Sequence, residues 1–135
     1  MTTWLAGMRI TADRLNDNSL DDSTTSGLVP ATNFNVNSFS GRKVSGITTV
    51  HVYLAYTGLG ITVSGSNISP DVLMATLPAG WRPPETINGF MGNGTWVGEC
   101  TISTNGQITA RAATANITDA NPNIRITADW ISENN

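Results

Sequence analysis

The difference between the two sets of alternate residues in one long run restricts the fold of this chain more than any other feature. In the run Ile47–Tyr56 one alternate set is clearly more apolar than the other, and successive side chains of an extended strand point to opposite sides. One face should therefore point into a hydrophobic core, and it consists of Val50, Val52, Leu54 and Tyr56. The other face consists of Thr49, His51, Tyr53 and Ala55. The pattern predicts a long strand with one buried face.

Shorter runs of the same kind, separated by Gly, Asn, Ser and Pro, predict about eight short strands in all. Charged residues make up 13% of the chain, below the roughly 25% of an average soluble domain, so Thr, Ser and Asn must supply much of the polar surface. These residue types suit pleated strands and the turns between them. The other expected strands are Phe34–Val36, a short one around Val44, Ile61–Val63, Val72–Leu77, Ile87–Met91, Trp96–Ile102, Gln107–Ala112 and Ile124–Ile131.

Three short segments indicate how the strands are connected. Asn105-Gly106, between apolar residues, is the strongest hairpin signal in the sequence. Ser40-Gly41 is expected to form a turn between two strands. The segment Pro78–Pro84 ends in two adjacent prolines, which lack backbone donors, so it should be an exposed extended crossing between sheets.

Together these features predict an all-β fold, an antiparallel β-sandwich or jelly-roll that occupies residues 34–135. Residues 16–33 are dominated by Asn, Asp, Ser and Thr without a sustained period, which indicates a polar linker. Residues 1–15 form an expected N-terminal arm, in which Thr11 is suited to cap a short helical turn. The large apolar residues of this arm are Trp4, Leu5, Met8, Ile10 and Leu15.

Charge and cysteine content exclude several classes of function. The net charge is −3, and the seven Lys and Arg residues are scattered singly, which disfavours binding to nucleic acid. Cys100 is the single cysteine, so the sequence offers no intrachain disulfide and no sign of an oxidising compartment. The N-terminus lacks a signal-peptide pattern, and no apolar run approaches the roughly 20 residues of a spanning helix. We expect cytoplasmic synthesis, no membrane insertion and no cofactor.

Residues suited to catalysis or metal binding are sparse. His51 is the single histidine and lacks a recognisable Ser or Asp motif, so we interpret it as a half-exposed strand residue beside Tyr53. His51 and Cys100 lack the paired spacing of a zinc site. The stretch Asp17–Asp22 offers oxygen ligands for calcium, but it lacks the Gly and closing Glu of an EF-hand, which favours a solvated linker. The sequence therefore predicts neither catalytic nor metal-binding residues.

Tryptophan positions leave a choice between core packing and ligand contact. Trp130, in the last expected strand, is interpreted as core, whereas the pattern around Trp96 leaves both roles open. Trp81 lies just before the two prolines, where covering the end of the sandwich is favoured over stacking against a sugar ring. The candidate ligand or partner contacts are Trp81, Arg82 and Trp96.

Two parts of the sequence resemble bacteriophage proteins. The segment Thr2–Asp17 (TTWLAGMRITADRLND) resembles the N-terminal segment of minor virion proteins from phages of actinobacteria. Leu77–Pro84, with the later segments Cys100–Ala110 and Ala128–Ser132, is similar to the LPAGYRP, I-x-x-x-G-x-V and W-I patterns of head domains in phage tail fibres and baseplate receptor-binding proteins. The resemblance implies a trimeric β-sandwich head and an attachment role for the arm residues Trp4, Leu5, Met8, Ile10 and Leu15.

The expected function is therefore that of a non-enzymatic virion protein of a bacteriophage, a tail appendage or a capsid or tail decoration subunit, assembled in the host cytoplasm. Its expected partners are other virion proteins, further copies in a homotrimer, and host surface carbohydrate. The short polar segment between arm and head suits a compact decoration subunit at least as well as a receptor-binding fibre. The alternatives are a carbohydrate-binding module or adhesin that uses aromatic loop residues, and a small hydrolase of unfamiliar type.

Overall fold

The computed structural model describes residues 22–132, and this part of the chain is entirely β-structure, without helices. The predicted all-β class is confirmed. The ten strands are β1 (Asp22–Thr24), β2 (Val29–Pro30), β3 (Phe34–Val44), β4 (Ile47–Tyr56), β5 (Val63–Ser64), β6 (Asn67–Thr76), β7 (Ile87–Gly92), β8 (Val97–Ile102), β9 (Gln107–Ala113) and β10 (Asn123–Ile131).

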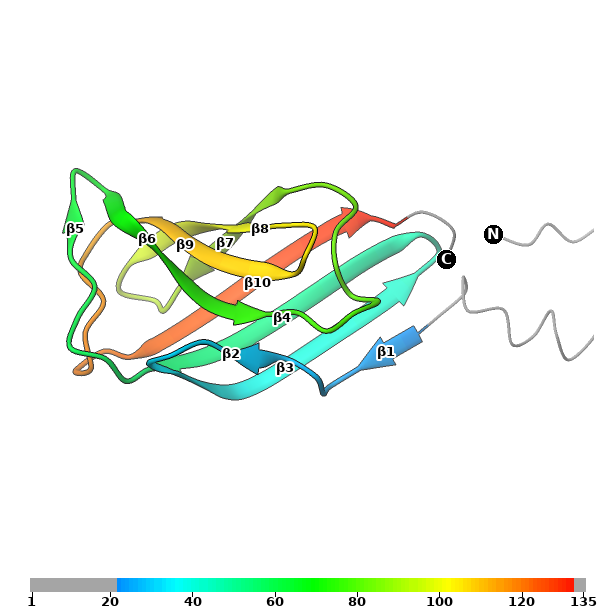
Figure 1. Cartoon of the computed structure of the whole chain (residues 1–135), viewed down its shortest axis with the longest axis horizontal. Helices are drawn as coiled ribbons and strands as arrows, with labels where there is room; N and C mark the ends of the chain where they lie inside the picture. The colour runs from blue at the N-terminus through cyan, green and yellow to red at the C-terminus, as the bar shows by residue number, and fades with distance from the viewer. Residues whose placement is uncertain (1–21, 133–135) are drawn as a thin grey trace, which may run out of the picture.

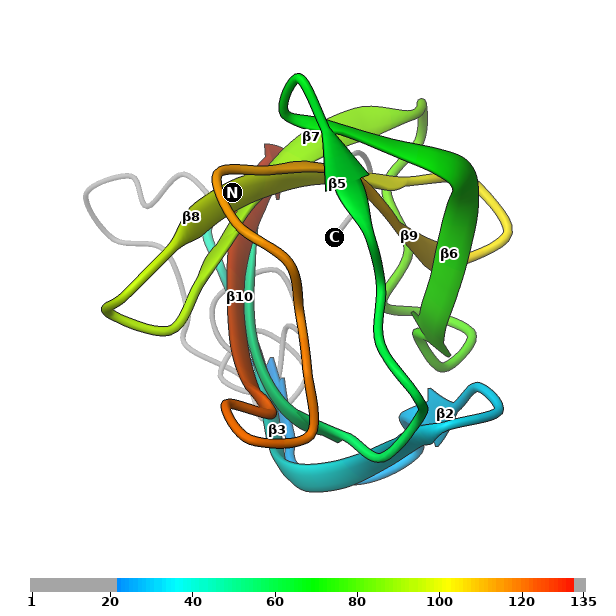
Figure 2. The same ribbon diagram turned by 90° about the vertical axis from the view of Figure 1, so that its left-hand side faces the viewer.

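All ten strands belong to one antiparallel sheet that curls round an apolar interior (Figure 1). The strand order is β1-β3-β4-β10-β7-β8-β9-β6-β2, and β5 pairs with β6. Seen end-on, the sheet closes almost into a ring, which brings β2 at one edge beside β3 near the other (Figure 2). The two opposing halves of the curled sheet thus face each other as the layers of a sandwich do, but they are continuous with each other.

The hydrophobic interior is formed by the inward faces of the strands. On β4 the predicted inward set is confirmed, because each of its four members is buried: Val50, Val52, Leu54 and Tyr56. The ring of Tyr56 also packs against Phe34 of β3, with 5.3 Å between ring centroids. Burial continues on β8, β9 and β10, and the fully buried side chains there include Ile102, Ile108, Ile124 and Ile126. Alternation of this kind positions the opposite faces of the same strands toward solvent.

The hairpin expected at Asn105-Gly106 is confirmed as the connection between β8 and β9. The Gly106 N–H donates to the Ser103 carbonyl at 2.8 Å, and the Ser103 N–H donates to the Gln107 carbonyl at 3.0 Å. Gly106 has a φ of 87°, a left-handed conformation that glycine adopts without steric cost. The arrangement is a three-residue loop of the kind that follows a tight turn with a left-handed residue.

The turn expected at Ser40-Gly41 is wrong. β3 runs without interruption from Phe34 to Val44, and the chain reverses at Ser45 and Gly46, which have φ values of 49° and 86°. Two consecutive left-handed residues suit the twist of a tight hairpin. Gly41 serves another purpose, since a Cβ there would lie 2.8 Å from Cε3 of Trp81, so its missing side chain makes room for the indole.

The described part of the predicted polar linker, residues 22–33, contains two short strands. Asp22–Thr24 pairs with β3, Asp22 lying opposite Lys43, and Val29–Pro30 pairs with β6. β1 thus extends one edge of the sheet, and β2 extends the other edge. Backbone hydrogen bonds hold these two strands in the sheet. Because neither strand has an alternation of apolar residues, the sequence pattern did not reveal them. Both strands of this segment therefore belong to the same sheet as β3 and β6.

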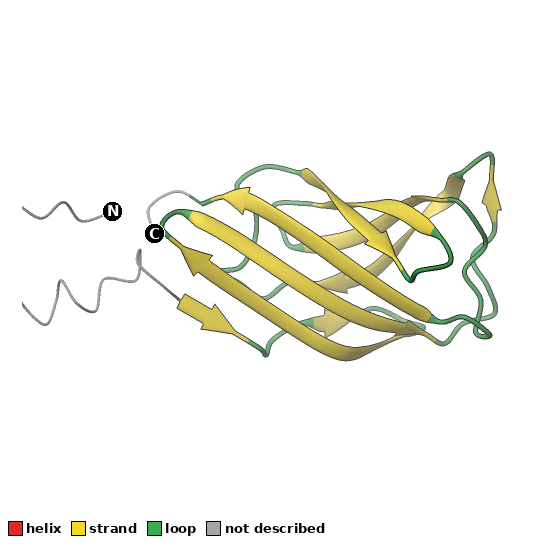
Figure 3. Ribbon diagram, turned by 180° about the vertical axis from the view of Figure 1, so that it is seen from behind, coloured by secondary structure: helices red, strands yellow, loops and turns green. Residues whose placement is uncertain are grey.

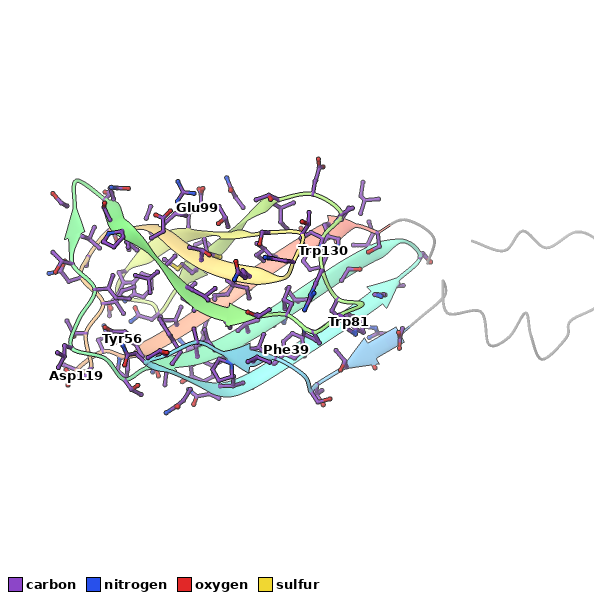
Figure 4. The ribbon with its side chains drawn as sticks, in the orientation of Figure 1. Phe39, Tyr56, Trp81, Glu99, Asp119 and Trp130 are labelled. Atoms are coloured by element: carbon purple, nitrogen blue, oxygen red, sulfur yellow. The ribbon has the colours of Figure 1, made fainter. Side chains whose placement is uncertain are left out.

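The segment between β6 and β7 is a loop, as predicted, but it is not an exposed extended crossing between sheets, because all strands form one sheet and Trp81 and Pro83 are buried. The Trp81 N–H donates to the Pro78 carbonyl at 3.1 Å, and the Arg82 Nε–H donates to the Leu77 carbonyl at 2.9 Å, so the loop is folded back on itself. The side chain of Trp81 points from this loop toward the end of β3 near β1 (Figure 4). The loop consequently packs its indole against the C-terminal part of β3, at Gly41 and Lys43.

Candidate functional site

The outer face of β3, β4 and β10 carries two adjoining hollows, and we take their shared surface as the candidate functional site. Figure 3 shows these three long strands side by side, seen from outside. One hollow has a volume of about 390 Å³ and lies toward β1, and the other has a volume of about 330 Å³ and lies toward the middle of β10. Ser40 and His51 line both hollows, so the two form one elongated groove, named here the outer groove.

Strand register places the polar side chains of the outer groove in rows across the three strands. Ser40, His51 and Thr127 lie opposite one another and are all exposed. The adjacent row consists of Ser38, Tyr53 and Arg125. Because side chains opposite one another in an antiparallel sheet have Cβ atoms roughly 4.5 to 5.5 Å apart, each row presents its groups to the same ligand-sized area.

An irregularity in β3 borders the second row. The pairing between β3 and β4 shifts between Val36 and Ser38, so one extra residue is accommodated in β3 at this point. Beyond the shift Ser38 lies opposite Tyr53, on the same side of the sheet as Ser40. Bulges of this kind redirect side chains and increase local twist. The bulge thereby aligns two serine hydroxyls along the groove.

Arg125 supplies the positive charge of this row. Its guanidinium carbon lies 4.8 Å from the centroid of the Tyr53 ring, within the range of a cation–π contact. Within residues 22–132 its guanidinium makes no hydrogen bond or ion pair. Its flanking outward residues on β10 are Asn123 and Thr127, and its partner on β7 is Gly92, so no carboxylate lies directly beside it. The stacked guanidinium is held in place while its N–H donors remain available.

The other end of the outer groove is apolar. Val44, Ile47 and Ile131 lie opposite one another on β3, β4 and β10, and they are 42%, 44% and 72% exposed. Three neighbouring aliphatic side chains with this exposure form a small hydrophobic patch next to the β3–β4 turn. The chain enters the domain at the same end, where β1 begins (Figure 1).

The structure separates the three ligand-contact residues that the sequence suggested. The side chain of Trp96 is 3% exposed and that of Trp81 is 9% exposed, so neither indole offers a free face for stacking. The structural role favoured for Trp81 fits its contact with Gly41 and the position of Lys43 Nζ, 4.7 Å from the ring centroid. Arg82 is exposed and is tied to its own loop. None of the three lines the outer groove.

Two further sequence-based predictions fall largely outside the described residues. The arm residues Trp4, Leu5, Met8, Ile10 and Leu15 lie there, as does most of the Asp17–Asp22 stretch. Among residues 22–132, no group of three or more His, Cys, Asp and Glu side chains is placed to hold a metal ion. The same residues contain no helix with the length and hydropathy needed to cross a membrane.

Sequence reasoning missed the outer groove, although one of its signals was visible. The alternation in β4 named His51 and Tyr53 as neighbours on the less apolar face, and the structure places both on the groove. Their partners on β3 and β10 depend on strand order and register, which local periodicity does not contain. His51 was interpreted as a strand residue beside Tyr53, and that placement is confirmed.

The buried thiol of Cys100 provides a prediction about pH. Burial raises the pKa of Cys100 from its ordinary 9.0 to about 12, and the protonated thiol donates to the Gly89 carbonyl at 3.6 Å. The folded state thus keeps the proton that the unfolded state releases above pH 9, so this stabilisation is complete below pH 9 and is lost as the pH rises toward 12. We expect the free energy of unfolding to fall by about 1.4 kcal/mol per pH unit over this window from Cys100 alone.

Chemical denaturation of the wild type and of Cys100→Ala at several pH values measures this contribution. The variant should show a shallower decline above pH 9, because it lacks the group responsible. A thiol reagent should modify native wild-type protein slowly and denatured protein fast. Equal declines in the two proteins would contradict the prediction.

Comparisons with known proteins place the fold among phage domains. No protein-family model matches the sequence, and no curated protein matches it. Among solved structures, the chain is similar to the head domain of phage bIL170, whose crystal structure was described in relation to a common fold for the receptor-binding domains of lactococcal phages. The TM-score is 0.56 and the identity is 14%, and the match covers 82% of this chain and 99% of that domain. The chain thus has the fold of a phage receptor-binding head domain.

Proposed function

We propose that this chain is a receptor-binding virion protein of a bacteriophage, whose β domain contacts the host surface and which performs no catalysis. The observation that carries the proposal is the fold, because the match spans 99% of the phage head domain rather than a fragment of it. The bacteriophage resemblance of the sequence is an independent argument for the same class. Because fold alone does not define function, the accessible outer groove is the second support.

The proposal includes a homotrimer attached to the particle through the N-terminal arm, Trp4–Leu15. Exposed apolar side chains support self-association, since the outer faces of the described strands carry several that a monomer leaves in water. They include Phe90 on β7 and Val97 on β8, which are 57% and 49% exposed and lie outside the outer groove.

Light scattering and a cell-binding assay on the full chain test the proposal. We expect a mass three times the chain's 14.3 kDa, binding of labelled protein to actinobacterial cells, and reduced phage adsorption in its presence. Deletion of residues 1–15 should abolish incorporation into particles while circular dichroism still shows a folded β domain. A chain that is incorporated but neither binds cells nor competes with adsorption is a decoration subunit, and that outcome overturns the receptor-binding role.

A further inference from the structure

The outer groove has the chemistry of a site for a sugar that bears an acidic group. Hydroxyl groups of Ser38, Ser40 and Thr127 line the hollow that lies toward the middle of β10. Each hydroxyl can both donate and accept hydrogen bonds, as binding to sugar hydroxyls requires. The ring of Tyr53 and the imidazole of His51 lie between them on β4. Small polar groups beside flat rings fit the alternating polar and apolar surfaces of a pyranose.

Arg125 adds a requirement for negative charge. A guanidinium presents its donors in a planar fork that matches the two oxygens of a carboxylate or phosphate. Here the guanidinium carbon lies over the Tyr53 ring, 4.8 Å from its centroid, and no described residue occupies its donors. A pre-ordered cation loses less side-chain freedom on binding than a mobile one. The charge and the hydroxyl rows occur within one hollow of about 330 Å³.

The shape of the groove indicates a chain of sugars rather than a single ring. The second hollow, about 390 Å³, continues from Ser40 and His51 toward the aliphatic side chains of Val44 and Ile47. Nucleic acid is a poor occupant, because a polyphosphate backbone requires a row of cations and the chain has a net charge of −3.

We propose that the outer groove binds an anionic oligosaccharide, with Arg125 pairing the acidic group, Tyr53 holding Arg125 and the serine and threonine hydroxyls bonding the sugar. This assignment names the ligand of the proposed receptor-binding function, and it rests on that function. Carboxylated and phosphorylated polysaccharides share this chemistry.

Calorimetric titration of the full chain with three defined probes tests the site. The probes are oligogalacturonate for carboxylate, phosphomannan oligosaccharide for phosphate, and maltohexaose as a neutral chain. We expect binding of at least one anionic probe and at least tenfold weaker binding of maltohexaose. The anionic probe that binds more tightly identifies the acidic group. Failure of the folded protein to bind either anionic probe overturns the inference.

Variants locate the binding and supply the control. Arg125→Ala should weaken binding of the anionic probe at least tenfold, whereas Arg111→Ala should leave it unchanged, because Arg111 pairs with Asp71 at 3.0 Å and does not line the outer groove. Each variant's melting temperature verifies that it folds. Equal affinities of Arg125→Ala and wild type overturn the assignment of the site.

The cell-binding assay keeps this inference distinct from the proposed function. Wild-type protein that binds host cells but no anionic probe retains the receptor-binding role and loses the groove assignment. Protein that binds the anionic probe through Arg125 but binds no cells retains the groove and loses the receptor-binding role. If the outer groove is the receptor-binding site, Arg125→Ala should also reduce binding of the protein to cells.

Discussion

Leu54→Ala is expected to lower the free energy of unfolding by about 2 to 5 kcal/mol, the range for removing a large buried aliphatic side chain. Leu54 is fully buried in β4, whose neighbours in the sheet are β3 and β10. Truncation removes three carbons from contact with the interior and leaves a cavity that paired strands on both sides prevent from closing. Because small domains are stable by about 5 to 15 kcal/mol, this single change removes a large part of the total.

Leu59→Ala is the matched control, since it makes the same chemical change at a fully exposed position. Its effect should stay within about 0.5 kcal/mol. Urea denaturation followed by tryptophan fluorescence measures both variants. Similar losses in the two variants would mean that β4 does not present this face to the core, which would contradict the register of the central sheet.

Local alternation predicted the parts of the fold in which one strand face is buried. The inward face of β4 and the hairpin at Asn105-Gly106 both follow from patterns contained within a few residues. The same reasoning failed at Ser40-Gly41, because glycine there is required by the Trp81 ring that packs on it from a loop distant in sequence. A close approach and a turn both select glycine, and sequence alone does not distinguish them.

The rest of the fold and the outer groove depend on strand order and register, which local sequence patterns do not contain. β1 and β2 carry no apolar alternation, and they join the sheet through backbone pairing with β3 and β6. The outer groove combines residues from three strands that are distant in sequence, and the pairing of β10 with β4 brings Arg125 to Tyr53. Aromatic residues attracted attention in the sequence because of their size, yet Trp81 and Trp96 are buried, and the groove uses smaller polar residues instead.

Trp81→Ala is expected to lower the free energy of unfolding by about 3 to 5 kcal/mol, because the indole is a large buried side chain that packs on β3. Its ring lies on Gly41 of β3 and beneath the ammonium group of Lys43, which is 4.7 Å from the ring centroid. Loss of the ring removes the apolar contact between β3 and the loop that precedes β7. Urea denaturation of the variant and the wild type measures the difference.

Two companion variants separate burial from charge at this position. Lys43→Met removes the ammonium group and keeps an apolar chain, so it should cost only about 0.5 to 1 kcal/mol, the range of an exposed cation–π contact. Trp81→Phe keeps a smaller ring over Gly41 and should fall between Lys43→Met and Trp81→Ala. If Trp81→Ala proves as stable as the wild type, the packing of the indole on Gly41 does not stabilise the fold, which contradicts the structural role of Trp81.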